Sequence, residues 1–126
     1  MLNVLIVDDS IIVRKMLTLE MQRLGYYVVG QAGSGQQAIE LYDEFVPDLV
    51  TMDITMSVMN GIEAVKVIKA KHKDAVIVMI TSHGEEKMVM EAIMSGAKGY
   101  ILKPISPQKI TDIVNKIYPD LQETVQ

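Results

Sequence analysis

The sequence predicts an α/β fold, a five-stranded parallel sheet with five helices distributed over both of its faces. Short apolar runs alternate along the chain with segments of helical periodicity, and this alternation is typical of parallel sheets covered by helices. Most residues in these runs are apolar, as expected for strands buried on both faces. With 49% hydrophobic residues, residues 1–126 are expected to form a single domain, with a frayed tail over residues 120–126.

The first strand is predicted over Leu2–Val7, an apolar run that stops at two aspartates. A helix follows from about Ser10 to Leu24, because apolar residues return there at helical spacing and Gly25 provides a stop. The residues predicted for its inner face are Ile12, Val13, Met16, Leu17 and Leu24. A second strand is predicted over about Tyr27–Gln31.

A capping pattern begins the second helix, and an apolar run marks the third strand. Ser34 and Gln37 have the spacing of a capping box, which predicts a helix from there to about Phe45. The run Leu49–Met52 is then predicted to be a strand. It leads directly to Asp53, so this aspartate is expected at the strand's carboxyl end.

The same capping spacing recurs before the third helix. Asn60 and Glu63 predict a helix that begins after Asn60 and ends near Lys71. The fourth strand is predicted over Ala75–Ile80, the most continuously apolar run, and is therefore expected at the centre of the sheet. It leads to Thr81.

The fifth strand is predicted between the last two helices in the sequence. A helix is predicted over about Glu85–Met94, with Gly96 as its stop. The strand Gly99–Leu102 follows and leads to Lys103. The final helix is predicted over Ser106–Ile117, because a serine cap and a first-turn proline precede a regular helical stripe.

Polar and charged side chains that could bind a ligand or take part in a reaction follow four of the five predicted strands. They are Asp8, Asp9, Asp53, Thr81 and Lys103. Ligands of open α/β sheets bind beyond the carboxyl ends of the strands, so these side chains are expected to converge on one site. Carboxylates gathered there repel one another unless a proton or a cation joins them. Hard carboxylate oxygens suit Mg²⁺, which commonly acts beside a phosphate.

The predicted site suits the acceptance of a phosphoryl group. An ionised aspartate such as Asp53 can act as a nucleophile toward phosphorus and form an acyl phosphate. A divalent metal would reverse the repulsion between the carboxylates and an anionic donor. Lys103 offers a positive charge to one phosphoryl oxygen, and Thr81 offers a hydroxyl to another. The chain shows no obvious strong general base, which favours phosphoryl acceptance over rapid hydrolysis.

Two other function classes fit these residues less well. A flavodoxin-like nucleotide-binding protein needs hydroxyls, glycines and backbone donors after the first strand, whereas this chain has Asp8-Asp9-Ser10. An aspartyl-nucleophile phosphatase commonly has a second acid two residues after its nucleophile. Thr55 occupies that position here and is a poor general acid. The chain also lacks room for a cap domain over the substrate.

Bulk properties exclude several further classes. The formal net charge is −4, which argues against direct nucleic-acid binding because a basic footprint is missing. The chain contains no cysteine, so disulfides and thiol chemistry cannot contribute. No apolar run is long enough to span a bilayer, and the N-terminus does not resemble a signal peptide. We therefore expect a cytoplasmic protein without membrane association.

Five short motifs occur in a characteristic order along the chain. They are Val7-Asp8-Asp9-Ser10, Met52-Asp53-Ile54, Met59-Asn60-Gly61, Thr81-Ser82 and Lys103-Pro104. Together they make the chain similar to the receiver domains of two-component response regulators, especially the stand-alone chemotaxis type. The resemblance extends from Leu2 to about Tyr118. It implies a flavodoxin-like, doubly wound sheet with strand order 2-1-3-4-5.

The resemblance also implies roles for individual residues at the phosphoryl and metal site. Asp53 would accept the phosphoryl group from a phosphohistidine on a sensor histidine kinase. Asp9 would bind Mg²⁺ directly, Asp8 chiefly through water, and Asp53 and the backbone carbonyl of Thr55 would complete the protein ligands. Lys103 would pair with the phosphoryl group.

A switch at the surface follows from the same resemblance. Thr81 would turn inward to bond the phosphoryl group, and Tyr100 would change rotamer into the vacated space. A phosphoryl group adds enough charge to bias a bistable loop. The altered surface would be the fourth helix, fifth strand and fifth helix, where a target protein docks. In a chemotaxis setting that target is a component of the flagellar motor switch.

Four positions depart from the family pattern or vary within it. The family usually has proline four residues after the acceptor aspartate, and Ser57 occupies that position here. This difference predicts a more mobile loop over residues 54–60. Val58 is apolar at a site expected to be exposed and is a candidate kinase contact. Thr55 and His83 occupy positions that tune phosphate lifetime in this family, although His83 is equally consistent with an inert loop residue.

The sequence therefore predicts a single-domain, monomeric switch that is activated by phosphorylation. It is not expected to be an enzyme beyond catalysing its own phosphorylation and slow dephosphorylation. A phosphorelay intermediate is an alternative role for the same chemistry. A phosphate-independent interaction module is another, and the intact set of acids, threonine and lysine argues against it.

Overall fold

The computed structural model describes residues 1–57 and 59–120, in which strands alternate with helices. The strands are β1 (Asn3–Val7), β2 (Tyr27–Ala32), β3 (Leu49–Asp53), β4 (Ile77–Thr81) and β5 (Gly99–Leu102). The helices are α1 (Ile11–Arg23), α2 (Gly35–Phe45), α3 (Gly61–Lys71), α4 (Glu86–Met94) and α5 (Pro107–Ile117). Each predicted element is present within two residues of its expected bounds. In this part of the chain, no helix is both long and apolar enough to cross a membrane.

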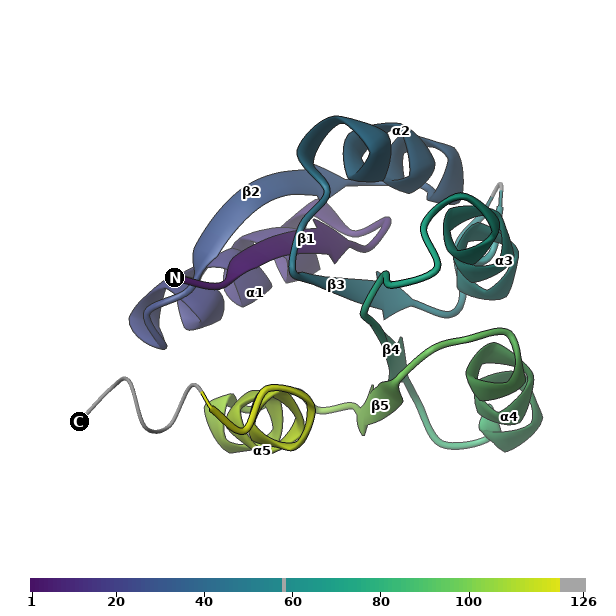
Figure 1. Cartoon of the computed structure of the whole chain (residues 1–126). Helices are drawn as coiled ribbons and strands as arrows, with labels where there is room; N and C mark the ends of the chain where they lie inside the picture. The colour runs from purple at the N-terminus through teal and green to yellow at the C-terminus, as the bar shows by residue number, and fades with distance from the viewer. Residues whose placement is uncertain (58, 121–126) are drawn as a thin grey trace.

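All five strands are parallel, in the predicted order β2-β1-β3-β4-β5 (Figure 1). The register brings the strand ends to one edge, because Val7 pairs with Met52 and Thr81 pairs with Leu102. The expectation that the fourth strand is central is wrong, since β3 occupies the middle and β4 lies between β3 and β5. The fully apolar run of β4 reflects burial on both faces, which every interior strand of such a sheet shares.

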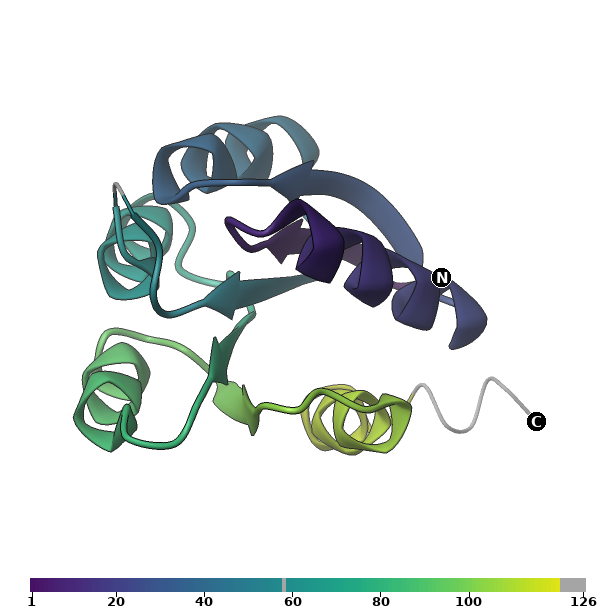
Figure 2. The same cartoon turned by 180° about the vertical axis from the view of Figure 1, so that it is seen from behind.

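The helices cover the two faces of the sheet unequally. One core lies between the sheet and α2, α3 and α4, and includes Tyr42, Ile68 and Ala92 from these helices. The other core lies between the sheet and α1 and α5, and includes Met21 and Val114. Figure 2, viewed from behind, shows α1 crossing the sheet on the side opposite α2 and α3. This doubly wound arrangement leaves the carboxyl edge of the strands open for a site.

Side-chain caps begin four of the five helices. Ser10, Ser34, Asn60 and Ser106 each accept a hydrogen bond from the backbone N–H three residues further on. The capping box predicted for Asn60 and Glu63 is complete. At α2 only half of it forms, because the Gln37 side chain accepts from the backbone N–H of Gly33. Helix α4 has no such side-chain cap, although Glu85 occupies its N-cap position.

The buried face of α1 differs from the predicted one. Leu17 is buried as expected, and Met21 is buried with it. Ile12 and Met16 are instead 72% and 62% exposed. Apolar residues lie on more than one side of this helix, so periodicity alone does not identify the stripe that contacts the sheet.

Candidate functional site

Three carboxylates, those of Asp8, Asp9 and Asp53, meet at the carboxyl edge of the sheet. One oxygen from each lies within 4.8 Å of the others. Asp8 and Asp53 are only 2% and 7% exposed, whereas Asp9 is exposed. Negative charges this close and this buried repel one another unless a proton or a cation lies between them. The cluster predicted from the strand ends is therefore present, and it is a candidate site for a divalent cation.

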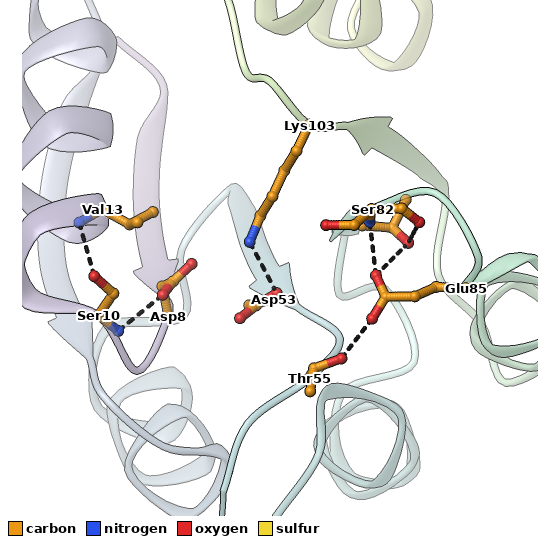
Figure 3. A network of polar contacts seen from close by, with 9 residues as sticks. Asp8, Ser10, Val13, Asp53, Thr55, Ser82, Glu85 and Lys103 are labelled. Carbon is orange, nitrogen blue, oxygen red and sulfur yellow. Dashed lines mark hydrogen bonds and ion pairs between the residues drawn. The ribbon is translucent and has the colours of Figure 1, made fainter.

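The two carboxylate oxygens of Asp8 have different surroundings. Its Oδ1 accepts a hydrogen bond from the backbone N–H of Ser10 at 2.8 Å, which fixes the turn from β1 into α1 (Figure 3). Its Oδ2 is buried, and no group in residues 1–57 and 59–120 donates to it. A buried carboxylate oxygen without a donor is costly, and a cation would satisfy it. The donor set thus fits Mg²⁺, which prefers carboxylate oxygens.

Burial and neighbouring acids raise the pKa of Asp53 to about 6. Loss of solvent is the largest cause, followed by the negative charge of Asp8, while Lys103 opposes the rise. Asp9 and Glu85 raise the pKa further. A carboxylate held at this pKa is easily ionised near neutral pH, and a bound cation would lower the pKa because it favours the charged form.

Gly61 lets α3 begin directly against the end of β3. Its backbone N–H donates to the carbonyl of Ile54 at 2.8 Å. A Cβ at this position would collide with the backbone carbonyl of Asp53. The Asn60 capping box fixes the start of the same helix. The Met59-Asn60-Gly61 motif thus holds the start of α3 against the backbone of Asp53.

Lys103 supplies the positive charge at this edge. Its Nζ lies 3.7 Å from Oδ1 of Asp53 (Figure 3). A cis peptide bond joins Lys103 to Pro104. The ammonium group of Lys109 donates to the carbonyls of Leu102 and Pro104 at 2.9 and 2.8 Å, so it ties both ends of the Lys103 segment to α5.

Glu85 is a site residue that the sequence did not reveal, because it was assigned only to the start of a helix. Its carboxylate accepts hydrogen bonds from the hydroxyls of Thr81 at 2.9 Å and Thr55 at 2.5 Å. It also accepts from the backbone N–H of Ser82 at 2.6 Å (Figure 3). These bonds lower the pKa of Glu85, with the Thr55 hydroxyl as the largest cause. Nothing in the sequence positions of Thr55 and Thr81 indicates that both hydroxyls donate to the same carboxylate.

The remaining predicted residues surround this centre. Thr81 is buried at the end of β4, and Tyr100 on β5 is 53% exposed. A hollow of about 420 Å³, lined by apolar side chains of α4, lies between these two residues. His83 and Ser57 are exposed in their loops. Val58, the candidate kinase contact, lies outside the described residues.

A comparison with known protein families assigns the chain to one of them. The model of the response regulator receiver domain matches residues 4–115. The chain belongs to the response regulator receiver family. The predicted family resemblance is thereby confirmed, and with it phosphorylation-dependent signalling of the CheY-like kind as the general function.

Individual relatives support the same assignment. This receiver is 46% identical to the chemotaxis protein CheY of Thermotoga maritima, over 91% of this chain and 96% of that protein. It is 44% identical to CheY of Bacillus subtilis, over 90% and 95% of the two chains. Among solved structures, the CheX–CheY–BeF3–Mg²⁺ complex from Borrelia burgdorferi matches with a TM-score of 0.88 and 35% identity, over 93% of this chain and 89% of that one.

Proposed function

We propose that this receiver is a phosphorylation-activated switch in which Asp53 accepts a phosphoryl group from a phosphohistidine of a sensor histidine kinase. An oxygen of Asp53 forms a bond to phosphorus as the phosphorus–nitrogen bond breaks, and the departing imidazole nitrogen takes up a proton. The observation that carries the proposal is the buried acid cluster. In it the carboxylates of Asp8 and Asp53 lie close together, and Oδ2 of Asp8 has no hydrogen-bond donor among the described residues.

The same cluster supports a Mg²⁺ site formed by Asp8, Asp9, Asp53 and the backbone carbonyl of Thr55. When bound, Mg²⁺ supplies positive charge that offsets the repulsion between these carboxylates and an anionic donor. Lys103 is already directed at Asp53, where its ammonium group can pair with a phosphoryl oxygen.

The proposed switch links Thr81 to Tyr100. The Thr81 hydroxyl turns to donate to the phosphoryl group, and Tyr100 moves from its exposed position into the space beside Thr81. The hollow between the two residues supports this movement, because it offers room for an aromatic ring. Thr55 and His83, in the loops that flank Asp53, tune the lifetime of the phosphoryl group.

The surface of α4, β5 and α5 is the proposed docking site for a downstream target. Apolar side chains exposed on it are Met90, Ile93, Met94 and Tyr100. Met90, Ile93 and Tyr100 line one hollow, and a contiguous exposed apolar patch of this kind is typical of an interaction site. In a chemotaxis pathway the target is a flagellar motor switch component. We propose that the receiver acts as a cytoplasmic monomer, with the whole chain as one domain and without direct contact to nucleic acid or membrane.

The proposal is tested by measuring intact protein mass after incubation with acetyl phosphate. The expected result is one phosphoryl adduct that requires Mg²⁺ and is absent from Asp53→Ala. A folded protein that binds Mg²⁺ but forms no adduct would contradict the proposal and favour a phosphate-independent interaction module. Transfer of the adduct onward to a histidine of a second protein would identify a phosphorelay intermediate instead.

A further inference from the structure

The carboxylate of Glu85 joins the two loops that flank Asp53. Oε1 accepts from the Thr81 hydroxyl and from the Ser82 backbone, at the end of β4. Oε2 accepts from the Thr55 hydroxyl, in the loop after β3 (Figure 3). Both hydroxyls therefore point toward a negative charge that lies beside the proposed phosphoryl site.

The side chain of Glu85 serves this site and not its own helix. Glu85 stands at the N-cap of α4, yet it makes no capping hydrogen bond there. The N-cap residues of the other four helices all use their side chains to cap. The following acid, Glu86, accepts from the backbone N–H of Gly84, at 3.3 Å, and from its own backbone N–H. The contacts of Glu85 are thus particular to that residue and are not a property of acids at this helix start.

We propose that Glu85 is a positioning residue that holds the Thr81 hydroxyl in the resting state, so that a phosphoryl group on Asp53 must compete with Glu85 for this hydroxyl. This inference rests on the proposed function. A hydroxyl has one proton to donate, so Thr81 can bond Glu85 or a phosphoryl oxygen but not both. A hydrogen bond to a carboxylate is about twice as strong as a neutral one, so Glu85 is an effective competitor.

The geometry also makes release of Thr81 feasible. When the Thr81 hydroxyl leaves, Oε1 of Glu85 keeps the hydrogen bond from Ser82 and Oε2 keeps the one from Thr55. Glu85 is therefore not left as an unpaired charge, which would make switching prohibitively costly. Glu85 therefore favours the resting state by the free energy of one hydrogen bond, the one that it accepts from Thr81.

The test measures the affinity of the Mg²⁺-loaded protein for beryllofluoride, which stands in for the phosphoryl group on Asp53, by titration calorimetry. Glu85→Ala is expected to bind about three- to tenfold more tightly than wild type, because the competitor for Thr81 is removed. Glu86→Ala is the matched control, with the same charge change one residue away, and is expected to leave the affinity unchanged. Glu85→Gln is expected to give an intermediate gain, since an amide accepts a weaker hydrogen bond.

Combination with Thr81→Ala separates the hydrogen bond from simple charge repulsion. If Glu85 acts by holding Thr81, the gain from Glu85→Ala shrinks toward onefold when Thr81 is alanine. An equal gain in both backgrounds would mean that Glu85 acts through space, and this would overturn the proposal. If Glu85→Ala gives no gain, or binds more weakly, in the protein that retains Thr81, the proposal is overturned as well.

A spectroscopic signature complements the affinities. Without beryllofluoride, the Thr81 methyl resonance of Glu85→Ala is expected to move toward its position in the beryllofluoride-bound wild type, whereas that of Glu86→Ala stays in place. The proposed function fails separately, if wild type does not bind beryllofluoride with Mg²⁺ or if Asp53→Ala binds it equally well. Binding by wild type with no dependence on Glu85 would refute only the present inference.

Discussion

The ammonium nitrogen of Lys103 lies 3.7 Å from Oδ1 of Asp53, in the only cation–carboxylate pair that the described residues place at the acid cluster. The Asp53 side chain is 10% exposed and that of Lys103 is 36% exposed, so the pair is partly shielded from water. Lys103 is also the one group that lowers the pKa of Asp53 against the effects of burial and of the neighbouring acids. It offsets part of the charge of the cluster, but the buried Oδ2 of Asp8 still has no hydrogen-bond partner among residues 1–57 and 59–120.

Replacing Lys103 by methionine is expected to raise the pKa of Asp53 above about 6, because the opposing positive charge is lost. Phosphorylation by acetyl phosphate should slow by on the order of tenfold or more, since a charge at the reacting group is removed. The pKa is measured from the pH titration of the Asp53 carboxyl carbon by NMR. Lys98→Met serves as a control away from the site, and an unchanged Asp53 titration in Lys103→Met would contradict the prediction.

Ionised Asp53 is expected to reduce stability in the absence of metal. Because its folded pKa of about 6 lies above the ordinary aspartate value of 3.8, the folded protein binds this proton more tightly than the unfolded chain. The destabilisation is complete above about pH 6 and disappears below pH 3.8. Asp53→Asn should therefore increase the free energy of unfolding at pH 7.5 in EDTA, by up to about 3 kcal/mol.

Chemical denaturation at several pH values measures this effect. The gain from Asp53→Asn should shrink steadily as the pH falls from 6.5 to 4, where the wild-type carboxyl becomes protonated. Asp74→Asn, at an exposed loop position, provides a control for the loss of one acidic group. A gain that is the same at both ends of this range would show that Asp53 is not perturbed in the predicted direction.

Mg²⁺ is expected to stabilise the receiver through the buried oxygen of Asp8. At a free concentration about ten times the dissociation constant, binding to the folded state adds about 1.4 kcal/mol. Asp8→Asn should lose most of this gain, because an amide nitrogen or oxygen is a poor substitute for the missing carboxylate ligand. Thermal unfolding with and without Mg²⁺ measures the shift. Equal shifts in wild type and Asp8→Asn would place the ion elsewhere.

Alanine at Gly61 is expected to destabilise the fold and to displace Asp53. The new Cβ would press on the backbone carbonyl of Asp53, and such overpacking costs about 1–3 kcal/mol. The matched control is Gly30→Ala, whose Cβ would meet only side-chain atoms at 3.5 Å or more. Denaturation gives the free energies, and Mg²⁺ affinity reports the displacement. A Gly61→Ala variant as stable as Gly30→Ala would argue against the close approach of α3 to β3.

Proline at Ser57 is expected to restrict the loop over residues 54–60. A proline that fits the native backbone stabilises by about 0.4–1 kcal/mol, chiefly by limiting the unfolded chain. Hydrogen exchange should slow in this segment of Ser57→Pro but not in Ser57→Ala, which removes only the hydroxyl. Unchanged exchange in the proline variant would refute the idea that serine makes this loop more mobile.

Local patterns in the amino-acid sequence were enough to predict the architecture and most of the candidate site. Buried parallel strands have continuous apolar runs, and caps, glycines and prolines mark where helices begin and end, so every element was placed within two residues. Because parallel strands end at a common edge, the proximity of Asp8, Asp53 and Lys103 could be predicted from the sequence alone. These inferences depend on local patterns and on one topological rule.

Features that depend on which groups meet across the fold could be seen only in the three-dimensional structure. It showed that β3 and not β4 is central, and that Ile12 lies outside the core, since burial depends on neighbours that periodicity does not identify. It also brought Glu85 to the hydroxyls of Thr55 and Thr81. Thr55 is 30 residues from Glu85 along the chain, and a hydrogen bond over that separation is set by loop geometry, which leaves no periodic trace in a sequence.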